Sequence, residues 1–200
     1  MKTFNTAGPC KADLHYMLDP LKRFNLAEVE YFIEQQRYFV LHAPRQTGKT
    51  TSLFALVDYL NQQGRYRAVY ANIEIAQTAR HHVDQGMRAI CGTIGDAARR
   101  YVGEQRLHDW TEQAWATRGE HGVLMGMLGY WSEADSRPIV LVLDEVDALV
   151  GDTLISLLRQ LRAGYGQRPA SFPQSIILCG VRDVRDYRIH TAHQEIITGG

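Results

Sequence analysis

The sequence has few cysteines, no long apolar run and no net charge, and each shortage argues against a class of protein. Its cysteines are odd in number and far apart, which argues against a disulfide framework and for a reducing compartment; they are Cys10, Cys91 and Cys179. No apolar stretch approaches the roughly 18 residues that a membrane-spanning helix needs, and residues 1–20 lack the continuous apolar segment of a secretory signal. We therefore expect a cytoplasmic protein with no membrane partner.

The charges balance, and lysine is rare. The 22 basic residues equal the 22 acidic residues in number, so no overall positive field draws the chain to nucleic acid or to an anionic membrane. Lysine occurs only at Lys2, Lys11, Lys22 and Lys49. A chain of 200 residues with 45% hydrophobic residues suits one globular domain with a substantial core.

Hydrophobic patterning predicts that strands and helices alternate. Short apolar runs predict strands at residues 38–42, 67–74, 138–145 and 175–180. Apolar residues spaced three and four apart predict helices at residues 26–36, 49–60, 83–101, 106–133 and 152–163. Such an alternation implies a mainly parallel sheet with helices on both faces, which is an α/β three-layer sandwich.

Residues 43–50, "APRQTGKT", fit the phosphate-binding Walker A pattern, with alanine in place of its first glycine. In such a loop, backbone N–H groups and the following helix N-terminus cradle phosphate oxygens. Lys49 would reach the β- and γ-phosphates, and the Thr50 hydroxyl would ligate Mg²⁺. We predict that the nucleotide is bound by Ala43, Pro44, Arg45, Gln46, Thr47, Gly48, Lys49, Thr50 and Thr51.

Two carboxylates, Asp144 and Glu145, end the buried run "VLVLDE". Ligands of an open parallel sheet bind at the carboxyl ends of its strands, so Asp144 is expected to hold Mg²⁺ beside Thr50. Glu145 is then placed to polarise an attacking water as a general base. The alternative, that the carboxylates only cap the next turn, is disfavoured by the phosphate loop upstream. Asp147 either tunes the metal site or starts the following turn.

The motifs together resemble those of the AAA+ and STAND ATPases, within the P-loop NTPase fold. A guanine-specifying NKxD and an LSGGQ-like segment are absent, which argues against a GTPase and a transporter ATPase. The chain is more closely similar to a group of bacterial AAA-like ATP-binding proteins. The similar segments are "FNTAGPCKADLHYMLDPL", "YFVLHAPRQTGKTT", "YANIE", "VLVLDEVDALVGDTLISLLRQLRAGY" and "SIILCGVRDVRDYRI".

The resemblance implies that ATP or ADP is the nucleotide and that ATP is hydrolysed with Mg²⁺. Two alternatives stay open: a regulatory switch that hydrolyses slowly or not at all, and a DNA-associated ATPase, which rests on fold analogy alone. Turnover and salt-dependent DNA binding would distinguish the three.

The resemblance also implies further site residues. Asn72, at the end of the second strand, would hydrogen-bond the catalytic Glu145, although an asparagine there could equally form a turn. Arg182 in "GVRD" would sense the γ-phosphate, although its charged neighbours suggest surface ion pairs as an alternative. Candidates for contact with the adenine precede the phosphate-loop strand and are His15, Tyr16, Pro20 and Leu21.

The resemblance sets an expected domain organisation. Residues 1–36 would form an N-terminal arm and helix that belong to the nucleotide site, and residues 37–200 would form the ATPase core. Related ATPases continue with a final strand and a helical lid, which are not found before residue 200. We therefore expect a fragment or a reduced protein, with a homo-oligomer or an effector domain beyond residue 200 as partner.

Several other polar residues could have a functional role or could simply face solvent or pack in the structure. His190 and His193, or His81 and His82, could belong to a metal site, but they lack a partner at a recognised ligand spacing. We interpret them as solvated or packing residues. An arginine at residue 159 or 162 could reach a neighbour's γ-phosphate in an oligomer, or could simply face solvent.

Overall fold

The chain folds around one parallel sheet of four strands in the order β1-β4-β3-β2. This computed structural model describes residues 2–5, 8–10, 13–23, 25–42, 47–180, 189–190 and 196–197. The strands of the sheet are β1 (Phe39–His42), β2 (Arg67–Asn72), β3 (Ile139–Asp144) and β4 (Ser175–Gly180). A short antiparallel pair consists of β5 (Ile189–His190) and β6 (Ile196–Ile197). The prediction of an α/β fold with a parallel sheet is confirmed.

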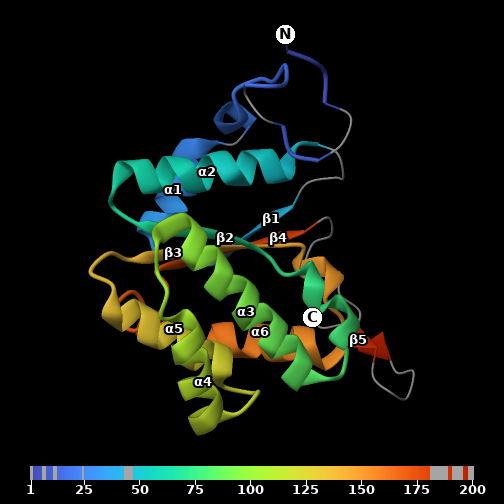
Figure 1. The fold of residues 1–200 in the computed structure, drawn as a ribbon, viewed down its shortest axis with the longest axis vertical. Helices are drawn as coiled ribbons and strands as arrows, with labels where there is room; N and C mark the ends of the chain where they lie inside the picture. Colours follow the sequence, from blue (N-terminus) through green and yellow to red (C-terminus); the bar gives the residue numbers. More distant parts are fainter. Residues whose placement is uncertain are drawn as a thin grey trace.

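Helices cover both faces of the sheet, as Figure 1 shows. The α-helices are α1 (Leu26–Glu34), α2 (Lys49–Gln63), α3 (Val83–Val102), α4 (Leu107–Arg118), α5 (Val123–Ala134) and α6 (Gly151–Gly164). Short 3₁₀ helices are η1 (Pro20–Arg23), η2 (Glu74–Ala79), η3 (Val146–Ala148) and η4 (Tyr165–Gln167). One face packs against α1 and α2, and the other packs against α3, α5 and α6. The described helices include none with the length and apolar character to cross a bilayer.

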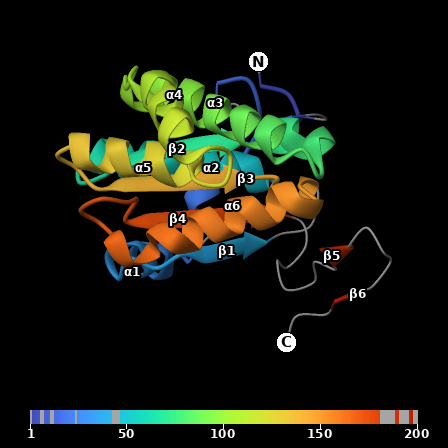
Figure 2. The ribbon, with the colours of Figure 1, turned by 90° about the horizontal axis from the view of Figure 1, so that it is seen from below.

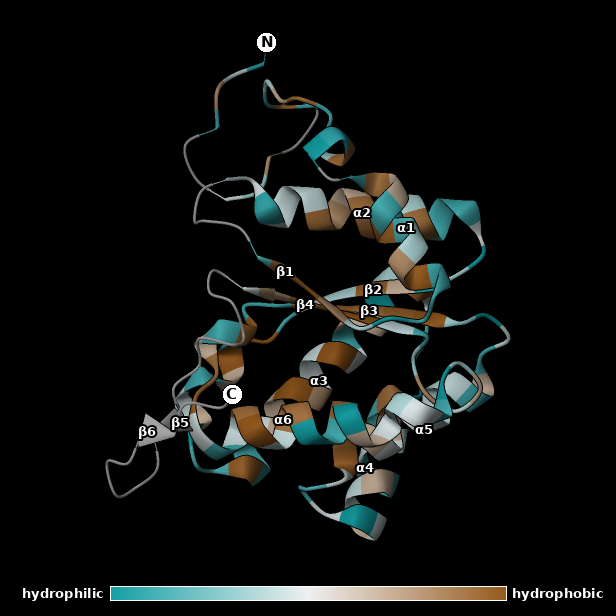
Figure 3. Cartoon of the chain, turned by 180° about the vertical axis from the view of Figure 1, so that it is seen from behind, coloured by the Kyte–Doolittle hydropathy of each residue, from teal (hydrophilic) through white to brown (hydrophobic). Residues whose placement is uncertain are grey.

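Two hydrophobic clusters, one on each face, hold these layers together. Every residue of β3 is buried, because neighbouring strands flank it and helices cover both of its faces. In Figure 3 the strands are largely brown, while the helices carry teal on their outward surfaces. The continuous apolar run of β3 therefore belongs to a central strand that is covered on both faces, as its sequence pattern predicts.

Helix ends follow the glycine pattern of the sequence. Gly64 closes α2 in the left-handed conformation, with φ of 72°. Residues 106–133, which the sequence predicts to be mostly helical, form two helices, α4 and α5. Gly119 has φ of 61°, which a helix interior does not accept, and α4 ends there.

Strand order brings distant parts of the sequence to one edge of the sheet. β4 lies between β1 and β3, and all neighbouring strands are parallel. Figure 2 looks onto the face of the sheet and shows the strands side by side in the order β2, β3, β4 and β1. The segments that leave β1 and β3 therefore emerge at the same edge.

Gln160 of α6 connects three helices that cover the same face of the sheet, α3, α5 and α6. It is 3% exposed, and its Oε1 accepts hydrogen bonds from the backbone N–H groups of Leu124 (2.9 Å) and Met125 (3.2 Å) at the start of α5. Its Nε2 donates to the Glu120 carbonyl at 3.0 Å and lies 3.3 Å from the sulfur of Met87 on α3. These bonds satisfy backbone donors that the first turn of α5 cannot satisfy itself.

Replacing Gln160 by Leu is expected to lower the free energy of unfolding by about 2 kcal/mol, because buried backbone groups lose their partners. Chemical denaturation followed by circular dichroism measures the change. Gln113→Leu on the exposed side of α4 is the matched control, with an expected change within about 0.5 kcal/mol. Equal effects of the two substitutions would contradict the prediction.

Candidate functional site

The start of α2 and the end of β3 meet at the carboxyl edge of the sheet. Lys49 is the first residue of α2, and Gly48 before it has φ of 81°, a conformation that favours glycine. Asp144 is the last residue of β3, and Glu145 follows it with φ of 58°. A positive φ is uncommon for glutamate and turns the chain sharply at the end of the strand.

Asp144 is the centre of the hydrogen-bond network. Its side chain is 1% exposed. One carboxylate oxygen, Oδ1, lies 2.8 Å from Lys49 Nζ and accepts the backbone N–H of Glu145 at 3.0 Å. The other, Oδ2, accepts the hydroxyl of Tyr70 at 2.9 Å and that of Thr50 at 3.4 Å. A buried carboxylate is stable only with such partners, and here both oxygens have them.

Lys49 contacts both members of the acidic pair. Its ammonium lies 3.3 Å from Glu145 Oε1, in addition to its contact with Asp144. Burial alone would lower the pKa of Lys49, but hydrogen bonds and charge attraction from Asp144 and Glu145 outweigh it and raise this pKa. Lys49 therefore carries a full positive charge at neutral pH.

Glu145 is the more accessible of the two acids. Its side chain is 29% exposed, against 1% for Asp144. Among the residues that the structure describes, Lys49 is the side chain that contacts its carboxylate. The two acids thus differ in environment: one is buried and fully hydrogen-bonded, and the other keeps lone pairs free for water.

Tyr70 belongs to this site, although the sequence analysis did not identify it. Its pKa is raised by burial and by the negative charge of Asp144, so the phenol stays protonated and donates its hydrogen bond. A tyrosine in a buried strand usually has a hydrogen-bond partner for its hydroxyl. This rule was the one sequence signal that could have pointed to Tyr70. The pairing of β2 with β3, which selects Asp144 as that partner, could not be read from the sequence.

A cavity of about 440 Å³ opens beside Lys49, between α1, β1 and the start of α2. Its polar lining includes Arg23, Asn25 and Glu28, which the sequence analysis also missed. A β-carbon added to Gly48 would lie 3.0 Å from the Arg23 guanidinium, so this arginine lies against the phosphate loop. The other residues that line the cavity are Val29, Phe32, Phe39, Val40, Leu41, His42, Thr47, Lys49, Ser52 and Leu53.

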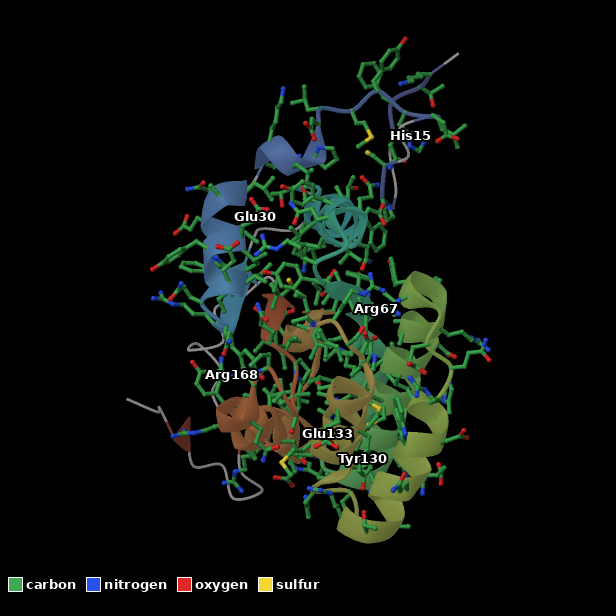
Figure 4. The ribbon with its side chains drawn as sticks, turned by 90° about the vertical axis from the view of Figure 1, so that its left-hand side faces the viewer. His15, Glu30, Arg67, Tyr130, Glu133 and Arg168 are labelled. Atoms are coloured by element: carbon green, nitrogen blue, oxygen red, sulfur yellow. The ribbon has the colours of Figure 1, made fainter. Side chains whose placement is uncertain are left out.

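The residues proposed for adenine contact lie elsewhere. The cavity lining includes none of His15, Tyr16, Pro20 and Leu21. His15 pairs with Thr3 in an isolated bridge of the N-terminal arm, and Figure 4 shows it far from Arg67 on the sheet. Leu21 packs against the core formed by α1 and α2. Pro20 and Leu21 belong to η1, but the η1 residue that lines the cavity is Arg23.

Part of the predicted phosphate loop, Ala43, Pro44, Arg45 and Gln46, lies outside the described residues, and so does Arg182. The described part begins at Thr47. Thr51 accepts a hydrogen bond from the backbone N–H of Cys10 at 3.0 Å, which connects α2 with the N-terminal arm. The arm therefore touches the helix that starts the site.

Asn72 forms the turn that was the alternative to a catalytic contact. Its Oδ1 accepts the backbone N–H of Glu74 at 2.9 Å. Across the described part of the chain, no hydrogen bond joins Asn72 to Glu145. The carboxylate of Asp147 lies against Gly180, because a β-carbon there would be 2.7 Å from Asp147 Oδ1.

His81 contributes to a different part of the structure. Its Nδ1 lies 3.0 Å from Asp152 Oδ2, which connects the turn before α3 to the first turn of α6. His193 lies outside the described residues. In the portion of the chain that the structure describes, no three histidine, cysteine or acidic side chains converge as a metal-binding group.

Comparisons with known proteins agree with this geometry. The family model of the AAA domain matches residues 33–187, which include both the phosphate loop and the acidic pair. Curated protein sequences yield no match. Because the family model covers well over half of the sequence, the chain belongs to the AAA domain family of P-loop ATPases.

Proposed function

We propose that the chain binds ATP together with Mg²⁺ and hydrolyses it at the carboxyl edge of the sheet. The observation that carries the proposal is the convergence of four polar residues from two distant segments: Lys49, Thr50, Asp144 and Glu145. The membership of the chain in the AAA domain family also supports the proposal. Each residue has a side chain suited to one task in phosphoryl transfer.

Lys49 binds the β- and γ-phosphates in this proposal. Its ammonium is already charged and held by Asp144 and Glu145 at the start of α2. Phosphate oxygens carry several negative charges and compete well with two carboxylates for one ammonium. The N-terminus of α2 adds its own attraction for phosphate.

The donor set at the site fits Mg²⁺. Thr50 Oγ1 and Asp144 Oδ2 are hard oxygen donors 3.4 Å apart, and Mg²⁺ is usually bound by one or two carboxylates together with substrate phosphates. Thr50 would ligate the ion, and Asp144 would hold it through water. The bound ion would supply neutralisation of charge on the phosphate oxygens.

Glu145 orients and polarises the attacking water. It is the accessible acid of the pair, and its carboxylate retains lone pairs beyond its contact with Lys49. When Lys49 turns to phosphate, the Glu145 carboxylate becomes free to accept a proton from water. Asn72 would aid Glu145 by donating from its amide Nδ2, since its Oδ1 already accepts from Glu74. Arg182 would act as a γ-phosphate sensor.

The cavity beside Lys49 is the proposed site of the base and ribose. Its volume of about 440 Å³ falls within the range of small-molecule sites, and apolar walls meet a few polar groups there. Arg23, Asn25 and Glu28 offer donors and acceptors for the edge of a purine or for ribose hydroxyls.

Equilibrium binding of ATP and single-turnover phosphate release, each with Mg²⁺ and with EDTA, test the proposal. We expect Mg²⁺-dependent binding and release, and competition by ADP but less by GTP. Tight binding without release would support the regulatory switch in place of the hydrolase. Absence of binding in both conditions would overturn nucleotide binding itself.

A further inference from the structure

Tyr70 has a contact that goes beyond the packing of β2. We propose that Tyr70 is a positioning residue whose hydroxyl holds the Asp144 carboxylate in the orientation that binds Mg²⁺. This inference rests on the proposed function of the site. It adds a residue outside both sequence motifs to the apparatus that holds the metal.

The geometry fixes the hydroxyl on one oxygen of Asp144. Tyr70 lies on β2, which pairs in parallel with β3, and it is paired with Val142 two residues before Asp144. Its hydroxyl donates to Asp144 Oδ2 at 2.9 Å, and the residue is 8% exposed. The ring packs edge-on against Phe54 of α2, with centroids 4.7 Å apart. Phe54 therefore contacts the ring, and the hydroxyl is directed at the carboxylate.

The contacts of Asp144 divide into two kinds. Lys49 and Thr50 are the residues proposed to turn toward phosphate and metal, and both now contact Asp144. The other two donors are the Glu145 backbone N–H on Oδ1 and the Tyr70 hydroxyl on Oδ2. In the loaded site, Tyr70 is thus the side chain in the described structure that continues to hold the carboxylate.

Orientation of Asp144 matters because Mg²⁺ requires near-ideal octahedral geometry. A carboxylate that is 1% exposed has little water to replace a lost donor, so its plane would rotate if the hydroxyl were removed. Partners of this kind behind a metal ligand typically contribute about 10- to 100-fold to metal affinity. The alternative is purely structural: a buried phenol needs some acceptor, and Asp144 is the nearest one.

Tyr70→Phe separates the two explanations, because phenylalanine keeps the ring and its contact with Phe54. The probes are Mn²⁺ binding in the presence of ADP, followed by electron paramagnetic resonance, and ADP binding in EDTA. We expect about tenfold weaker Mn²⁺ binding and unchanged ADP affinity in EDTA. Tyr101→Phe on α3 is the matched control, since it removes a hydroxyl from a half-buried tyrosine, and it should leave both values unchanged.

A double-mutant cycle with Asp144→Asn tests whether Tyr70 acts through Asp144. We expect Tyr70→Phe to weaken Mn²⁺ binding much less in the Asp144→Asn background. Undiminished Mn²⁺ affinity in Tyr70→Phe, or an equal loss of ADP affinity in EDTA, would overturn the inference while leaving nucleotide binding intact. If the unaltered chain binds no ADP in either condition, the proposed function fails first and the inference fails with it.

Discussion

Replacing Glu145 by Gln is expected to lower the single-turnover rate of ATP hydrolysis by about 100- to 1,000-fold while ATP binding is retained. Glutamine has the same shape but cannot accept a proton from water. The buried Asp144 and its contacts with Thr50 and Tyr70 do not involve the Glu145 side chain, so the proposed metal site stays intact. Phosphate release from a stoichiometric enzyme–ATP mixture measures the rate.

The loss of one carboxylate charge needs a matched control. Glu133→Gln, at an exposed position on α5, makes the same chemical change outside the site. It should leave both binding and release unchanged. Equal phosphate release from Glu145→Gln and the unaltered chain would show that Glu145 is not the base and would favour the regulatory switch.

The sequence predicts the β3 end of this site well because the physical signal there is local. The five apolar residues of β3 and Asp144 after them are all buried, so the strand shows no alternation between apolar and polar positions. A carboxylate at the end of such a strand lies at the carboxyl edge of the sheet. Lys49 and Thr50 follow a glycine with φ of 81°, a position that the motif itself encodes. These residues needed only the rule that parallel strands share one carboxyl edge.

The remaining site residues depend on which elements lie beside one another, and a local pattern does not contain that information. In the sequence, nothing distinguishes Tyr70 from the other residues of β2. The pairing of β2 with β3 places it near Asp144. Arg23 reaches Gly48 through the path of η1 over α2, which no periodicity specifies. The helical pattern of residues 107–134 does not give the boundary between α4 and α5, because that boundary depends on the positive φ of Gly119.

Replacing Lys49 by Ala is expected to weaken ATP binding by about 100-fold, because the phosphates lose a charge-assisted hydrogen bond worth up to about 3 kcal/mol. Equilibrium binding of ATP in Mg²⁺ measures the loss. Lys22→Ala, at an exposed position in η1, is the matched control and should bind ATP normally. Unchanged affinity in Lys49→Ala would contradict the proposed phosphate site.

The same substitution should also destabilise the chain without nucleotide, since Lys49 neutralises the buried Asp144 at 2.8 Å. Loss of one partner from a buried ion pair typically costs about 3–5 kcal/mol. Three hydrogen bonds to Asp144 remain, so we expect about 2 kcal/mol here. Asp144→Asn in the Lys49→Ala background removes the unpaired charge and should restore most of that loss, without restoring ATP binding. Denaturation that shows no such recovery would mean that Lys49 stabilises the fold by packing and not by its charge.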